Sequence, residues 1–346
     1  MDEVLISVDG AAGRLSLNRP KAIHALNREM CLAMIAGVSR FVADPGVKAI
    51  VIDHAEGRGF CAGGDVAMIR QSALEDGGVA ARAFFADEYR LNHQLFTCAK
   101  PVVAFMDGIT MGGGVGLALP ARLRVATQNT RLAMPEAAIG LFPDVGGGWY
   151  LSRLPHRVGQ YLAIADTRID GADCLWLGLA THYLAAEALP EARRRIAAGE
   201  EPQAVLDSLA VAPPPAKIAA LAPQIERHFS HERVEDILAS LAGDASDWAQ
   251  ATRATILEKC PMTCKVAMVQ LARSLALTDF AENMAMEYRI GGRMIMRPDF
   301  PEGVRSVIID KDRSPKWNPA RLEDITEDAV DAIFAPLPAG EKWQPL

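Results

Sequence analysis

Short apolar runs rich in valine and isoleucine alternate with helix-forming segments through the first part of this 346-residue chain. These runs predict strands at residues 4–8, 14–18, 48–53, 101–106 and 123–126. Apolar residues at helical spacing predict a helix over residues 27–41, which Asn27 can cap, and residues 113–119 are also helix-forming. Strand–helix units that repeat with short connections favour an α/β fold with a mostly parallel sheet covered by helices.

The composition changes after about residue 190, where Ala, Glu, Arg and Leu dominate. The Ala-Pro-Pro-Pro run at 212–215 interrupts any helix and predicts a linker. Beyond it, amphipathic helices are expected at residues 225–241, 247–259, 263–277 and 280–296. We therefore divide the chain into an α/β core, residues 1–200, and a helical C-terminal region, residues 201–346. The helices can cover the core or join copies of the chain in a homo-oligomer.

The charge balance argues against a polyanionic partner. Lys and Arg number 36 and Asp and Glu number 43, giving a formal net charge of −7 and no overall field that would attract nucleic acid. No run of 18 apolar residues predicts a membrane helix, and the first residues lack the features of a signal peptide, so we expect a cytoplasmic protein. The six cysteines are too scattered for a disulfide framework, and their spacing fits no metal site.

Glycine-bearing segments are the candidate chemical sites. Residues 57–62 match the G-x-G-x-x-A dinucleotide fingerprint, but two further glycines stand where that motif needs its helix to begin. We prefer to interpret residues 60–65 and 111–117 as two loop-to-helix turns with free backbone N–H groups. Together such turns can hold an oxygen that gains negative charge. The alternative is that the glycines only permit tight packing or a positive φ.

The glycine turns, with the strand before the second one, resemble the crotonase (enoyl-CoA hydratase/isomerase) superfamily. Residues 133–148, 178–182 and 302–317 more narrowly resemble its 3-hydroxyisobutyryl-CoA hydrolase family. The resemblance implies a spiral of ββα units with a helical C-terminal region, an acyl-CoA substrate and no cofactor beyond the CoA of that substrate. It makes the N–H groups of Gly64 and Gly113 the oxyanion donors. It also places Gly63, Gly112, Asp65 and Lys21 near the substrate or CoA. The alternative for Lys21 is an ordinary solvent-exposed lysine.

The carboxylates distinguish the reactions of this superfamily. Its hydratases carry one glutamate after the glycine run and a second in a Pro-Glu pair; here Gly116 replaces the first, and Glu136 keeps the second. Asp144 fits the hydrolase pattern, so the resemblance implies a catalytic pair. Glu136 would then be base or nucleophile, and Asp144 would hold the substrate's 3-hydroxyl or move a proton. Residue type alone would instead predict that Asp144 caps a helix and that Glu136 faces solvent.

The implied activity is hydrolysis of a short branched 3-hydroxyacyl-CoA, as in valine degradation. An enoyl-CoA isomerase or hydratase is the nearest alternative, and a non-catalytic CoA-binding protein is a third. One polar segment stays ambiguous: Glu88, Tyr89, Arg90 and Asn92 resemble a block of the hydrolase family, so one of them could line the acyl pocket. Their residue types predict a solvent-exposed helix face instead.

Overall fold

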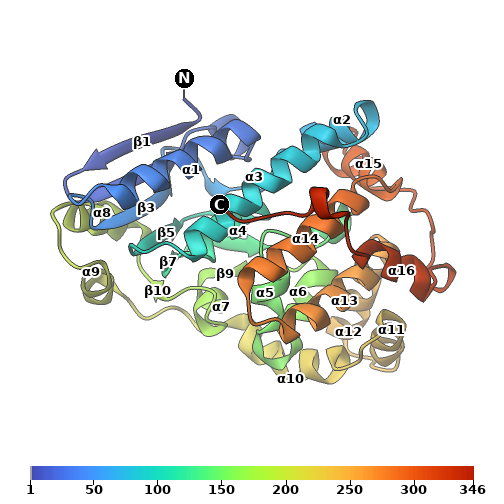
Figure 1. Ribbon diagram of the computed structural model, residues 1–346. Coiled ribbons are helices and arrows are strands. Elements are labelled where there is room, and N and C mark those ends of the chain that lie inside the picture. Colours follow the sequence, from blue (N-terminus) through green and yellow to red (C-terminus); the bar gives the residue numbers. More distant parts are fainter. Residues whose placement is uncertain (1) are drawn as a thin grey trace.

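The computed structural model describes residues 2–346, and a mixed sheet of six strands forms the centre of the α/β part (Figure 1). Its strands, in sheet order, are β1 (Val4–Asp9), β2 (Ala12–Leu17), β3 (Ala49–His54), β5 (Val102–Met106), β7 (Leu123–Ala126) and β10 (His182–Tyr183). Strands β1 and β2 form the expected antiparallel hairpin, and every later pair is parallel. All five predicted strands are present, and the mostly parallel arrangement is confirmed.

A second, smaller sheet brings the two glycine turns to one place. It consists of β4 (Gly59–Cys61), β6 (Ile109–Met111), β8 (Arg131–Ala133) and β9 (Ile169–Asp170). Strands β4, β6 and β8 run parallel, so their carboxyl ends lie at the same edge of the sheet. One glycine turn follows β4 and the other follows β6. The turns are therefore neighbours although about fifty residues separate them in the chain.

Helices cover both faces of the main sheet. Those of the first 209 residues are α1 (Arg28–Ala43), α2 (Val66–Glu75), α3 (Val79–Phe96), α4 (Gly113–Ala118), α5 (Gly147–Ser152), α6 (Val158–Ala165), α7 (Gly171–Trp176), α8 (Leu189–Ala197) and α9 (Pro202–Leu209). Asn27 caps α1 as predicted, because its side chain accepts a hydrogen bond from the Met30 N–H at 2.9 Å. Helices α8 and α9 pack on one sheet face, through a small apolar cluster that includes Val51, Phe105 and Val205.

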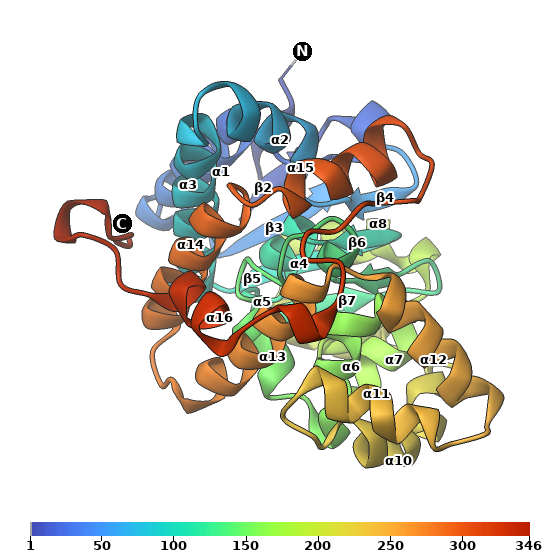
Figure 2. The same cartoon turned by 90° about the vertical axis from the view of Figure 1, so that its right-hand side faces the viewer.

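The C-terminal helices pack on the rest of the molecule. They are α10 (Lys217–Phe229), α11 (Val234–Ala242), α12 (Asp247–Glu258), α13 (Pro261–Ala276), α14 (Phe280–Met294), α15 (Asp299–Val304) and α16 (Glu327–Phe334). Figure 2 shows α14 at the left of the molecule below α3, with α13 below it; α13 contacts α5, and α14 contacts α3. One continuous apolar cluster joins these helices to the other sheet face. The boundary at residue 200 stays a prediction.

One predicted helix was wrong. Residues 225–241 form the end of α10 and most of α11, with a turn at 230–233 between them. The Ser230 hydroxyl donates to the Glu226 carbonyl at the end of α10, a local bond that competes with continuation of the helix. The chain then folds back, so that His228 bonds to Ser240 and Asp244. Residues 210–216 form no helix, as the Ala-Pro-Pro-Pro run predicts, and their part as a linker between domains stays a prediction. None of the helices in residues 2–346 is long and apolar enough to cross a membrane.

Candidate active site

The two glycine turns lie against each other. A Cβ atom built on Gly113 would stand 3.2 Å from the Gly64 nitrogen, so the two residues touch. Gly63 has a φ of +116° and Gly112 a φ of +46°, and glycine adopts this left-handed region far more readily than other residues. Within residues 2–346 neither the Gly64 nor the Gly113 N–H has a hydrogen-bond acceptor. Two free backbone donors are therefore held side by side.

A cavity of about 280 Å³ opens beside these turns. Its lining includes the four turn glycines, Gly63, Gly64, Gly112 and Gly113, and four acidic residues, Glu88, Glu136, Asp144 and Asp166. Apolar side chains from α2, α3 and the C-terminal region form part of the wall, and Arg168 also lines it. An enclosed apolar pocket with a few convergent polar groups is the usual form of a small-molecule site.

Glu136 lies next to the second glycine turn. It begins a short 3-10 helix, Glu136–Ala138, after β8, and its side chain is 5% exposed. Its Oε2 atom has no hydrogen-bond partner, and its Oε1 atom would lie 3.1 Å from a Cβ on Gly112. Burial, together with the nearby Asp144 carboxyl, raises the pKa of Glu136 well above its usual value. An unpartnered buried oxygen of this kind is available to a substrate or a water molecule.

Asp144 is 5% exposed and is held by a neighbouring side chain. The Tyr89 hydroxyl donates to its Oδ2 atom at 2.8 Å. Burial raises the pKa of Asp144 to about 7, while the Tyr89 bond opposes this shift. The interpretation from residue type alone was wrong for both acids, because Glu136 and Asp144 are buried. Helix α5 begins after Gly146 and takes no side-chain cap from Asp144.

Helix α3 supplies residues that the sequence analysis placed on a solvent-exposed face. That placement was wrong for Glu88, Tyr89 and Asn92, which are all buried. Arg90 is partly exposed and pairs with Asp87 at 2.9 Å. Glu88 lines the cavity, and its Oε1 atom has no hydrogen-bond partner. Burial and the Asp144 carboxyl raise the pKa of Glu88 well above its usual value.

The spacing along α3 contained the signal for this burial. Glu88 and Tyr89 follow Phe84 and Phe85 by four residues, which places them on the same, buried helix face. With Glu88, three buried carboxyl groups line the cavity, and the half-buried Asp166 is a fourth acid there. Burial disfavours the charge on each of these three groups and raises its pKa, and the Asp144 carboxyl adds to the shifts of Glu88 and Glu136.

Gly116 stands where the hydratase pattern has a glutamate, and its surroundings leave no room for one. A Cβ atom there would lie 2.6 Å from the Val145 Cβ and 2.9 Å from the Asn92 Nδ2. Asn92 also donates from Nδ2 to the Gly116 carbonyl at 2.9 Å. Neighbouring side chains fill the space of a second hydratase carboxylate.

Two residues expected near CoA do not line this cavity. The Asp65 side chain accepts from the Met68 N–H and caps α2, and it pairs with Arg19 at 2.9 Å. Lys21 is exposed in the short 3-10 helix Pro20–Ala22. A part for either residue in CoA binding stays a prediction. No group of three or more His, Cys, Asp or Glu residues in the described chain is arranged to hold a metal ion.

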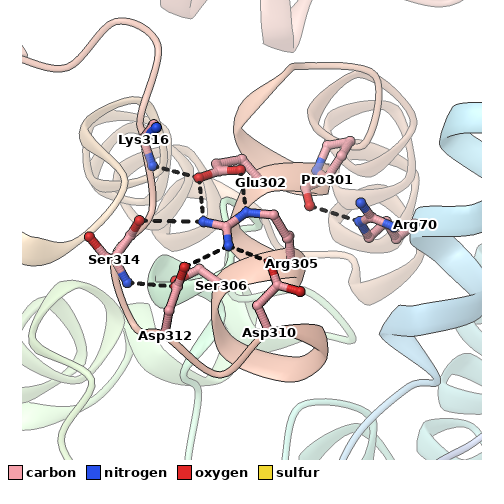
Figure 3. Close-up of polar contacts among 9 residues, drawn as sticks. All are labelled: Arg70, Pro301, Glu302, Arg305, Ser306, Asp310, Asp312, Ser314 and Lys316. Atoms are coloured by element: carbon pink, nitrogen blue, oxygen red, sulfur yellow. Dashed lines mark hydrogen bonds and ion pairs between the residues drawn. The ribbon is translucent and has the colours of Figure 1, made fainter.

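The segment that follows α15 is organised by one arginine (Figure 3). The Arg305 guanidinium donates to both carboxylate oxygens of Glu302 at 2.8 Å. It also donates to Asp310 at 2.6 Å and to Asp312 at 2.7 Å. The Lys316 backbone N–H donates to Glu302 at 2.8 Å, so both ends of the segment bind the same carboxylate. This cluster accounts for much of the acidic and basic pattern in residues 302–317.

The same segment forms one wall of the cavity. Arg305–Ile309 is a π-helix, and its residues Val307 and Ile308 line the cavity. Arg70 on α2 donates to the Pro301 carbonyl at 2.9 Å and ties the segment to the helix that follows the first glycine turn. The C-terminal region thus contributes directly to the shape of the site.

Comparisons with known proteins agree on the family. The enoyl-CoA hydratase/isomerase family matches residues 12–334. The mitochondrial 3-hydroxyisobutyryl-CoA hydrolase of Xenopus laevis is 40% identical over 343 residues, covering 96% of this chain and 89% of the relative. The corresponding human protein is 37% identical over 348 residues, covering 97% of this chain and 89% of the relative.

Solved structures with other names have the same architecture. A carnitinyl-CoA dehydratase from Mycobacterium thermoresistibile superposes with a TM-score of 0.94 at 36% identity and covers 98% of both chains. An enoyl-CoA hydratase from Rhodobacter sphaeroides 2.4.1 gives a TM-score of 0.92 at 32% identity, covering 99% of this chain and all of that one. The names of these related proteins thus include a hydrolase, a dehydratase and a hydratase.

Proposed function

The chain belongs to the enoyl-CoA hydratase/isomerase family, and we propose that it hydrolyses a short branched 3-hydroxyacyl-CoA, foremost 3-hydroxyisobutyryl-CoA. The products are 3-hydroxyisobutyrate and free CoA, a step of valine degradation. The observation that carries the proposal is the site itself: buried carboxyl groups stand beside two free N–H donors, and Val145 and Asn92 leave no space for a second hydratase glutamate at Gly116.

In the proposed mechanism the thioester oxygen accepts hydrogen bonds from the N–H groups of Gly64 and Gly113. These donors stabilise the negative charge that develops when the carbonyl carbon becomes tetrahedral. The Glu136 carboxylate takes a proton from water as the water oxygen attacks that carbon. The carbon–sulfur bond then breaks, and the leaving thiolate takes up the proton to give CoA.

A second route uses Glu136 as the nucleophile. Its oxygen attacks the carbonyl carbon and expels CoA, which leaves a mixed anhydride that water then splits. The unpartnered Glu136 oxygen suits either route. In both routes Asp144, held by Tyr89, grips the 3-hydroxyl of the substrate or passes on a proton. Glu88 is a third group that can exchange protons inside the cavity.

Hydration of an enoyl-CoA is the second candidate function, favoured by the names of the two superposed structures. An enoyl-CoA isomerase, which needs a single carboxylate, stays the related alternative. The filled space at Gly116 opposes the two-glutamate route to hydration. A cytoplasmic location, the lack of a cofactor and a homo-oligomer all stay predictions from the sequence.

The deciding experiment supplies three thioesters to the purified protein: 3-hydroxyisobutyryl-CoA, 3-hydroxypropionyl-CoA and crotonyl-CoA. Free thiol and enoyl absorbance are followed in the same samples. We expect thiol release from the two 3-hydroxyacyl substrates, fastest from the branched one, and little change with crotonyl-CoA. Rapid loss of enoyl absorbance without thiol release would replace the hydrolase assignment with a hydratase.

A further inference from the structure

A buried glutamate from the C-terminal region binds the loop that carries Asp144. Glu287 lies on α14 and is fully buried. The Gly146 N–H donates to its Oε2 atom at 2.6 Å, and the Gly148 N–H donates to its Oε1 atom at 2.9 Å. These N–H groups belong to the first turn of α5, where backbone donors have no partner within the helix. They follow Asp144 by only two and four residues.

The other side of Asp144 is held from α13. Gln270 donates from Nε2 to the Pro143 carbonyl at 2.7 Å and to Glu287 Oε1 at 3.1 Å. Asn283 donates to the same Oε1 atom at 2.9 Å, and the Ser274 hydroxyl orients Asn283 by donating to its Oδ1 atom at 2.7 Å. The loop is therefore anchored immediately before Asp144 and again just after it.

The backbone of this loop requires such anchors. Val145, the residue after Asp144, has a φ of +53°. A β-branched residue rarely adopts this left-handed conformation, and the strain persists only where the surroundings hold it. If the anchors are lost, Val145 can relax to an ordinary φ, and the rotation of its backbone moves the neighbouring Asp144.

We propose that Glu287 is a positioning residue, which holds Asp144 in its working place through the N–H groups of Gly146 and Gly148. The inference rests on the proposed function, because it takes Asp144 to contact the substrate. It makes the C-terminal helices part of the catalytic apparatus as well as of the fold. A simple helix cap would stabilise α5 without any special link to Asp144.

The substitution Glu287→Gln tests the link with little change of shape. Four donors converge on this side chain, and a glutamine amide turns one acceptor into a donor that faces a backbone N–H. The matched control is Glu282→Gln, the same change at an exposed residue of the same helix. Thermal unfolding establishes that each variant is folded.

A double-mutant cycle then separates positioning from general stability. We measure kcat/KM for thiol release by the wild type, Asp144→Asn, Glu287→Gln and the double variant, with 3-hydroxyisobutyryl-CoA and with isobutyryl-CoA. The kcat/KM of Glu287→Gln should be at least about tenfold below that of the wild type. The ratio of the losses on the two substrates should be the same as for Asp144→Asn. The kcat/KM of the double variant should lie within about threefold of that of Asp144→Asn alone. Once the Asp144 carboxylate has been removed, a change in the position of residue 144 has little left to affect.

Losses that multiply in the double variant would overturn the inference and leave Glu287 a structural cap. If Asp144→Asn alone leaves kcat/KM unchanged for both substrates, the proposed role of the Glu136–Asp144 pair fails, whatever the result for Glu287→Gln. The failure of the proposed function and the failure of this inference are therefore distinguishable. If Glu287→Gln does not fold, the cycle is run with Gln270→Ala, which removes the bond to the Pro143 carbonyl. Non-additive losses in kcat/KM would again support the inference, and multiplying losses would overturn it.

Discussion

Because several acids are buried, we expect the free energy of unfolding to fall as the pH rises. The substitution Asp144→Asn should remove part of this fall. Burial raises the pKa of Asp144 in the folded protein to about 7, from an ordinary value of 3.8. Between these values the unfolded chain has released the proton, while the folded protein still binds it. Because the folded state then binds more protons, the free energy of unfolding falls with rising pH across this interval.

The size of the effect follows from that shift. About three pKa units at 1.36 kcal/mol each give about 4 kcal/mol, an upper figure because the acids in the cavity share their protons. Below pH 4 an asparagine resembles the protonated acid, and its Oδ1 can still accept from Tyr89. The variant should therefore match the wild type at low pH and exceed it progressively up to about pH 7, with no further gain above that.

Urea unfolding of both proteins at half-unit steps from pH 4 to pH 8 measures this difference. Comparing the two proteins at each pH cancels the titration of the groups that do not interact with Asp144. A difference in unfolding free energy that stays constant from pH 4 to pH 8 would refute the reasoning. It would show that Asp144 is already ionised, at no cost, in the folded protein.

Three further substitutions test separate parts of the site. Gly113→Pro removes one oxyanion donor and should lower kcat by about 10²–10³, whereas Gly113→Ala, which keeps the N–H, is the control for crowding against Glu88. Gly116→Glu should not create crotonyl-CoA hydration, because Val145 occupies the space; measurable hydration by a folded variant would contradict this. Arg305→Met should raise KM about tenfold by loosening the wall segment, while Arg313→Met at an exposed arginine should not.

The parts of the site that local motifs encode were predictable from the sequence. The two segments with Gly64 and Gly113 were recognised as loop-to-helix turns, but strands β4 and β6, which directly precede them, were not predicted. Glu136 and Asp144 likewise belong to one short motif, which the resemblance identified. Their burial was not visible from residue type, since it depends on helices that pack over them from elsewhere in the chain.

The remaining residues reach the site across long sequence separations. Tyr89 precedes Asp144 by 55 residues, and Glu287 follows Gly146 by 141, so no local pattern announces either contact. For Glu88 a four-residue spacing from Phe84 held the information, but its charge argued for solvent exposure. A buried acid among apolar neighbours breaks the ordinary amphipathic pattern, and such breaks are expected at functional sites.

In the proposed mechanism Glu136 drives release of CoA from a 3-hydroxyacyl thioester. The most direct test compares wild type and Glu136→Gln for thiol release from 3-hydroxyisobutyryl-CoA at saturating substrate. We expect kcat to fall by about 10²–10⁴ with little change in KM, because the amide keeps the shape but can neither take a proton nor attack the carbonyl. A folded Glu136→Gln protein that releases CoA at the wild-type rate would contradict it.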